Sequence, residues 1–167
     1  MRRAKTRSRV PERMSARSPL QPAHAPSQIE RREWSIGSDV QAIAPIVDTV
    51  QALCLAAGFP ARHVRLNIPV AVTEALSNAI LRGNDAVTHR RVHISVVLDA
   101  ARLLVEVTDE GEGFDISVAQ SSPDDADWLD REDGRGVFLM RSLMDHVESR
   151  MPDAQRGHTL RLILHRS

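Results

Sequence analysis

Lysine, cysteine and tyrosine are nearly or wholly missing from this chain of 167 residues. Its one lysine, Lys5, lies near the N-terminus, so the rest of the chain supplies no lysine for a P-loop, a Schiff base or a eukaryotic-type protein kinase. Its one cysteine, Cys54, rules out a disulfide framework and a cysteine-rich metal site. Tyrosine is absent, and 3 Phe and 2 Trp are too few for platforms of stacked rings that bind nucleic-acid bases.

Long apolar runs are also lacking. The most apolar stretch, residues 42–59, is interrupted by Pro45, Asp48 and Gln51, and it falls short of the roughly 20 apolar residues that a membrane-spanning helix needs. The basic start of the chain has no apolar segment and so is not a secretory signal, although its arginine and serine content leaves an organellar transit peptide as a less favoured alternative. We therefore expect a cytoplasmic protein without a membrane partner, and the low cysteine content agrees with a reducing compartment.

The zero net charge hides an asymmetry along the chain. Residues 1–33 hold nine basic and three acidic residues, whereas residues 34–167 hold thirteen basic and nineteen acidic ones. The neutral total argues against a strongly cationic protein that binds nucleic acid directly. Residues 1–28 have four prolines, no glycine and no periodicity, and we interpret them as a disordered tail, with an arm that contacts an acidic partner as the alternative. Residues 29–167 form the predicted folded domain.

The periodicity of apolar residues predicts the order of the elements. Alternation and helical spacing indicate a strand at 33–36, helices at 40–57, from residue 62 or 69 to 82, and at 137–144, and strands at 92–98, 103–108, 146–150 and 159–165. The polar segment 117–133 is predicted to be a mobile loop. This order predicts an α+β fold in which one mixed sheet carries helices on one face.

Two polar side chains stand four positions apart in the second predicted helix. Glu74 and Asn78 therefore share one face, and asparagine is a poor helix former. A functional reason would be a metal-bound phosphate, because an amide oxygen can ligate Mg²⁺ and a carboxylate can accept a proton. The alternative is a solvated polar stripe, and the pair alone favours that alternative.

Two glycine-rich segments follow this helix. Asp109 opens the run 109–113 at the end of an apolar strand, where glycine lets the backbone approach a ligand and a buried aspartate can accept a hydrogen bond from an exocyclic amine. Gly134, Arg135 and Gly136 open the third predicted helix, where free N–H groups and the helix dipole attract anions. Each segment alone is a weak signal. The alternative is an ordinary strand-to-loop turn for the first and a flexible hinge with a capping role for the second.

Taken together, the three segments resemble the motifs of the GHKL (Bergerat-fold, histidine-kinase-like) ATPase superfamily. Residues 74–84 look like its N-box, residues 109–114 like its G1 box and residues 134–144 like its G2 region. The compact size of the chain and the residues of its G2 region are most similar to those of the anti-sigma-factor serine/threonine kinases, one branch of this superfamily. The resemblance covers roughly residues 30–166.

The resemblance implies a Bergerat-type two-layer α/β sandwich, with a mixed, mostly antiparallel sheet and helices on one face. It also implies that ATP and Mg²⁺ bind between the helices and the sheet. Glu74 would be the catalytic base for a serine hydroxyl, Asn78 would bind Mg²⁺, and Asp109 would hold the adenine amine. The other nucleotide-binding residues that the resemblance implies are Arg82, Gly111, Gly113, Gly134, Arg135, Gly136 and Thr159.

The resemblance also implies partners and a role in transcription regulation. The substrate would be an anti-anti-sigma protein with a STAS-type domain, and a sigma factor would be the second partner. A homodimer is also implied, because relatives in this branch commonly dimerise. Arg82 departs from the family pattern, because relatives often carry histidine there. It could contact a phosphate or pair with Glu74, and the latter would lower the basicity of that glutamate. A nucleotide-binding anti-sigma regulator without kinase activity is therefore the alternative, and the ATP-binding part of a two-component histidine kinase is least favoured.

Overall fold

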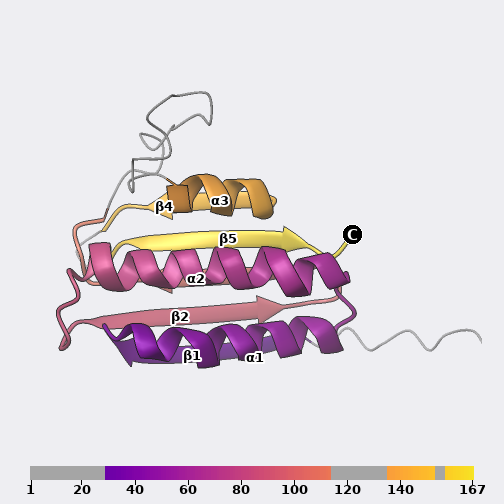
Figure 1. Cartoon of the computed structure of the whole chain (residues 1–167), viewed down its shortest axis with the longest axis horizontal. Coiled ribbons are helices and arrows are strands. Elements are labelled where there is room, and N and C mark those ends of the chain that lie inside the picture. The colour runs from indigo at the N-terminus through magenta and orange to yellow at the C-terminus, as the bar shows by residue number, and fades with distance from the viewer. Residues whose placement is uncertain (1–28, 114–134, 153–156) are drawn as a thin grey trace, which may run out of the picture.

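The computed structural model of the chain (Figure 1) describes three stretches, residues 29–113, 135–152 and 157–167. The predicted tail (1–28), the predicted loop (117–133) and Gly134 lie outside these residues. The division into a tail and a folded domain at residue 29 therefore stays a prediction.

Five strands form one sheet in the order β1-β2-β3-β5-β4. Their bounds are β1 Glu30–Gly37, β2 Arg91–Leu98, β3 Arg102–Thr108, β4 His146–Arg150 and β5 Thr159–His165. The sequence predicts a mixed sheet, but every pairing among these strands is antiparallel. β3 and β4 do run in the same direction. Because β5 lies between them and pairs with both, the described strands contain no parallel pair.

The α-helices lie on one face of this sheet, in front of the strands in Figure 1. The helical segments are η1 Val40–Ala42, α1 Ile43–Ala56, η2 His63–Asn67, α2 Ile68–Asn78, η3 Ala79–Gly83 and α3 Arg135–Leu143. Within the described residues, no helix combines the length and the apolar character that a membrane span requires. The predicted α+β sandwich with helices on one face is confirmed.

Local signals in the sequence mark the ends of α1. Asp39 accepts a hydrogen bond from the N–H of Gln41 (2.9 Å), so Asp39 rather than Ser38 caps the helical segment. Pro45 lies in the first turn of α1, where no intrahelical donor is needed. Gly58 follows the last turn with φ at 77°, the left-handed conformation that commonly ends a helix.

The second predicted helix consists of three successive segments. α2 is flanked by the π-helical turns η2 and η3, and in the second of these the N–H of Asn84 donates to the carbonyl of Ala79, five residues back, at 2.9 Å. Such turns are rare and occur frequently at functional sites. The turn η3 follows the helix that carries Glu74 and Asn78, and it ends at Gly83, which packs against the residue after β3.

The core lies between α2 and the central strands. The apolar stripe of the second helical stretch, Ile68, Val72, Leu76 and Ile80, is 0% exposed. Alternate residues of the three central strands face it, namely Val92, Ile94, Val96, Leu98, Leu103, Val105, Val107, Leu160, Leu162 and Leu164. A fully buried side chain of this kind contributes roughly 1.5–3 kcal/mol. This packing fixes α2 over the sheet and so fixes the polar residues on its flank.

The segments that carry the predicted site converge at one end of the sandwich, on the left in Figure 1. Thr108 at the end of β3 pairs with Thr159 at the start of β5, which in turn pairs with Arg150 at the end of β4. α2 and η3 end, and α3 begins, at this same end of the sheet. Antiparallel pairing therefore brings together segments that are more than fifty positions apart in the chain.

Candidate functional site

The polar pair on α2 meets the first turn of α3. A Cβ atom added to Gly136 would lie 2.5 Å from Oε2 of Glu74 and 3.5 Å from Nδ2 of Asn78. The side chains of Glu74 and Asn78 are both half-buried. Only a residue without a side chain lets the Glu74 carboxylate approach α3 so closely. The structure thus joins Glu74, Asn78 and Gly136 into one group, which we call the α2–α3 group.

Asp109 forms the centre of a second group, directly after β3. It is 2% exposed, and its Oδ1 accepts a hydrogen bond from the N–H of Gly111 at 2.9 Å. Gly83 packs on the carboxylate so closely that a Cβ there would lie 2.3 Å from Cγ of Asp109. A Cβ on Gly111 would in turn lie 1.9 Å from the carbonyl oxygen of Gly83. The end of η3 therefore covers the Asp109 loop through direct backbone contact.

His158 completes this second group, and sequence reasoning missed it. Nδ1 of His158 lies 3.1 Å from Oδ2 of Asp109, and Nε2 lies 2.8 Å from Oγ of Ser149 on β4. The imidazole is 1% exposed, and Gly113 lies against it, since a Cβ on Gly113 would come within 2.7 Å of the ring. We call Asp109, Gly111, Gly113 and His158 the Asp109 group.

Thr159, which the resemblance assigns to the adenine side, has its side chain on the opposite face of the sheet from His158. Its hydroxyl lies 2.9 Å from the hydroxyl of its cross-strand partner Thr108. Neighbouring residues of a strand point to opposite faces, so the residue before Thr159 turns toward Asp109. The signal that could have found His158 is the register: if 108 pairs with 159, then 109 lies opposite 158, and the N–H of Asp109 indeed donates to the carbonyl of His158 at 3.0 Å.

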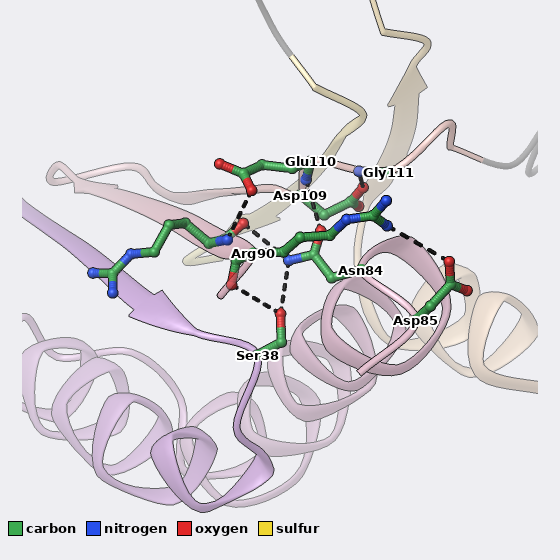
Figure 2. Close-up of polar contacts among 8 residues, drawn as sticks. Ser38, Asn84, Asp85, Arg90, Asp109, Glu110 and Gly111 are labelled. Atoms are coloured by element: carbon green, nitrogen blue, oxygen red, sulfur yellow. Dashed lines mark hydrogen bonds and ion pairs between the residues drawn. The ribbon is translucent and has the colours of Figure 1, made fainter. Parts of the chain in front are cut away.

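Asn84 holds the second group to the rest of the sheet (Figure 2). Its side chain is 0% exposed, and its Nδ2 donates to Oγ of Ser38 (2.9 Å) and to the carbonyl of Arg91 (3.0 Å). Its Oδ1 accepts a hydrogen bond from the N–H of Glu110 at 2.8 Å. One buried amide thus connects the residues after β1, the start of β2 and the loop that follows Asp109. Sequence reasoning assigned Asn84 no role beyond its place in the N-box.

The remaining predicted residues lie near these groups. Arg82 is exposed in η3, and Arg135 is half-buried at the start of α3, while Gly134 lies outside the described residues. A cavity of about 440 Å³ is lined by His93, Glu106, Thr108, Asp109, Glu110, Arg150, Gly157 and Thr159. This cavity opens on the face of the sheet that the helices leave uncovered, and its described lining does not include Glu74 or Asn78.

The amide oxygen of Asn78 in the α2–α3 group suits a magnesium ion that is shared with phosphates. Among the described residues, no three His, Cys, Asp or Glu side chains come close enough to hold a metal by themselves. Mg²⁺ usually takes one or two protein oxygens and completes its shell with phosphate oxygens and water. The amide of Asn78 beside the carboxylate of Glu74 fits that pattern. In the Asp109 group, each carboxylate oxygen accepts one bond and retains a lone pair for an exocyclic amine.

Comparisons with known proteins agree with this arrangement. Residues 36–164 match a family model described as histidine kinase-like ATPase domain. Anti-sigma F factors from Bacillus thuringiensis, Bacillus cytotoxicus and Bacillus mycoides are each 33% identical to the chain over 95 residues, which is 53% of the chain and 62% of the relative. The chain thus matches less than two thirds of the length of these relatives. The resemblance drawn from the three motifs is confirmed: the chain belongs to the family of histidine kinase-like ATPase domains, which implies that it binds ATP.

Proposed function

We propose that the chain is a Mg-ATP-dependent serine protein kinase that phosphorylates an anti-anti-sigma protein of the STAS type and sequesters a sigma factor. The observation that carries the kinase part is the α2–α3 group, in which the Glu74 carboxylate lies beside Asn78 and against the N-terminal turn of α3. The sigma-factor part is supported by relatives that are named anti-sigma F factors.

The Asp109 group would bind the adenine end of the nucleotide. Asp109 is held by donors on both of its oxygens, so it presents a fixed acceptor to the exocyclic amine of adenine. Gly111 and Gly113 let Gly83 and His158 pack closely around Asp109, and Thr159 supports the same strand end through Thr108.

The α2–α3 group would bind the phosphate end. Asn78 would supply an amide oxygen to Mg²⁺, which neutralises phosphate charge when it is bound. The N–H groups at the start of α3, with Gly134, Arg135 and Gly136, would bind phosphate oxygens, as helix N-termini commonly do. Arg82, exposed one residue before Gly83, would add a cation at the edge of this site.

Glu74 would act as the general base. A serine oxygen of the partner forms a bond to the γ-phosphorus, the bond from that phosphorus to its bridging oxygen breaks, and ADP leaves. Glu74 takes the proton that the serine hydroxyl loses. A positioned general base contributes typically about 10²–10⁴-fold, and positioning together with charge neutralisation supplies much of the rest.

A phosphotransfer assay with labelled ATP, Mg²⁺ and a STAS-type domain tests the proposal. We expect transfer to a serine of that domain, and a loss of about 10²-fold or more in Glu74→Gln. Glu30→Gln, at the far end of β1, is the matched control and should transfer at the wild-type rate. Wild-type transfer by Glu74→Gln would refute the role of Glu74. Nucleotide binding without transfer to any serine would instead support a partner-switching regulator without kinase activity.

Thermal melting gives a separate test of the nucleotide site. Mg-ADP at about 100 times its Kd should stabilise the fold by about 2.7 kcal/mol. Asp109→Asn should abolish this stabilisation, because a carboxamide offers one acceptor where the carboxylate offers two. Asp48→Asn, on the exposed side of α1, should keep it. An unchanged wild-type midpoint with Mg-ADP would contradict both the kinase and the regulator.

A further inference from the structure

The hydrogen bonds of the Asp109 group form a chain across three strand ends. Ser149 on β4 contacts Nε2 of His158, and Nδ1 of His158 contacts Oδ2 of Asp109. His158 and Asp109 are almost fully buried, at 1% and 2% exposure. A buried imidazole between a carboxylate and a hydroxyl has a defined pattern of donors, because the carboxylate only accepts.

That pattern places a proton on Nδ1 of His158. An ionised Asp109 can bond to this nitrogen only if the nitrogen carries a hydrogen. The hydroxyl of Ser149 can then donate to Nε2 of a neutral ring or accept from a charged one, so either charge state keeps Nδ1–H directed at Asp109. Since the N–H of Gly111 already holds Oδ1 at 2.9 Å, the His158 bond fixes the second oxygen and stops rotation of the carboxylate.

We propose that His158 is a positioning residue that sets the preference of the site for adenine. The inference rests on the proposed nucleotide site and deepens it. With both oxygens held, the carboxylate of Asp109 keeps its remaining lone pairs aimed in one direction, which suits the amino group of adenine. Hypoxanthine carries a carbonyl oxygen in place of that amino group, and this oxygen would face the carboxylate and be repelled. Without the Nδ1 donor the carboxylate rotates, and the discrimination between the two bases falls.

Titration calorimetry of ADP and IDP in the presence of Mg²⁺ tests this assignment on the full chain. We expect the wild type to prefer ADP, and His158→Leu to lose about tenfold or more of that preference, as the loss of a hydrogen bond to a charged group predicts. His158→Asn places an amide N–H near the Nδ1 position, so it should recover most of the preference. Melting without nucleotide measures the packing cost of each variant separately.

The outcomes separate two kinds of failure. Wild-type protein that binds neither nucleotide overturns the nucleotide site and the role of His158 together. Wild-type binding of ADP, with an unchanged ADP preference in His158→Leu and a lower melting temperature, overturns only the role of His158 and reduces it to packing. Should His158→Leu not fold, the ring nitrogens of wild-type His158 are observed by NMR: a proton on Nδ1 supports the proposal, and an unprotonated Nδ1 refutes it.

Discussion

Substituting Gly111 by alanine tests the closest contact of the candidate site. The new Cβ would lie 1.9 Å from the carbonyl oxygen of Gly83, 2.5 Å from its carbonyl carbon and 2.9 Å from its Cα. All three atoms belong to the backbone, so no side-chain rotation can relieve the overlap. The loop after Asp109 has to separate from η3.

The expected cost has two sources. Overpacking of a dense region costs typically about 1–3 kcal/mol. A loop that moves away also weakens the bond from the N–H of Gly111 to Asp109, and a hydrogen bond to a charged group contributes roughly 1.5–3 kcal/mol. We therefore expect Gly111→Ala to lower the free energy of unfolding by roughly 3–5 kcal/mol, or the midpoint by about 10 °C or more.

The sign of this effect makes the test decisive. Where the backbone conformation is compatible and space is free, Gly→Ala stabilises by about 0.4–1 kcal/mol through the unfolded chain. The measurement is thermal and urea unfolding of both proteins. The exposed neighbour Glu112→Ala is the control in the same loop and should change stability by less than about 0.5 kcal/mol. A Gly111→Ala protein that is as stable as the wild type would show that Gly83 and Gly111 are not packed together.

Three further predictions concern other parts of the chain. Gly136→Ala should displace the half-buried Glu74 carboxylate and so lower the rate of phosphotransfer at least about tenfold. The fold itself should become more stable by up to about 1 kcal/mol, because alanine favours a helix more than glycine does. An unchanged rate of transfer would contradict the contact of Glu74 with Gly136. Burial raises the pKa of the Cys54 thiol to about 12, so a thiol reagent should label it only after unfolding, and rapid labelling of the native protein would refute this. The contribution of the neutral thiol to stability should be full below pH 9.0 and should decline as the pH rises toward 12. Hydrogen bonds from the N–H of Ala101 and then from that of Arg102 lower the pKa of Asp99. The stability that these bonds contribute should therefore be present above pH 3.8 and be lost as the pH falls through the lowered pKa. A difference in stability between the wild type and Asp99→Ala that stays constant in acid would contradict this.

The elements with strong alternation could be predicted from the sequence almost to the residue. The last two strands have the predicted bounds, and β2 and β3 each begin one residue earlier than predicted. β1 is longer than predicted, at Glu30–Gly37 instead of 33–36. As an edge strand it pairs on one side only, and its first residues are charged and largely exposed, so apolar alternation could not reveal them.

The residue types of the candidate site follow from the sequence more than its contacts do. A spacing of four on a helix is enough to place Glu74 and Asn78 on one face, because helix geometry depends only on neighbours in the chain. Their contact with Gly136 depends on how α3 packs against α2, which no local pattern encodes. The same holds for Asn84, whose buried amide joins three segments through hydrogen bonds that only the assembled sheet brings within reach.

His158 is found from the strand register and not from residue types. A threonine at a strand start is a plausible polar contact for a nucleotide, whereas a histidine beside it has no obvious partner in the sequence. The antiparallel pairing of β3 with β5 sets Thr108 against Thr159, and the pleat then turns the following pair, Asp109 and His158, to the opposite face. Because η3 covers that face, the pair is buried. The buried carboxylate of Asp109 therefore needs its hydrogen bonds with Gly111 and His158. Extending the strand register by one residue therefore finds the partner of Asp109, which a search among polar residue types passes over.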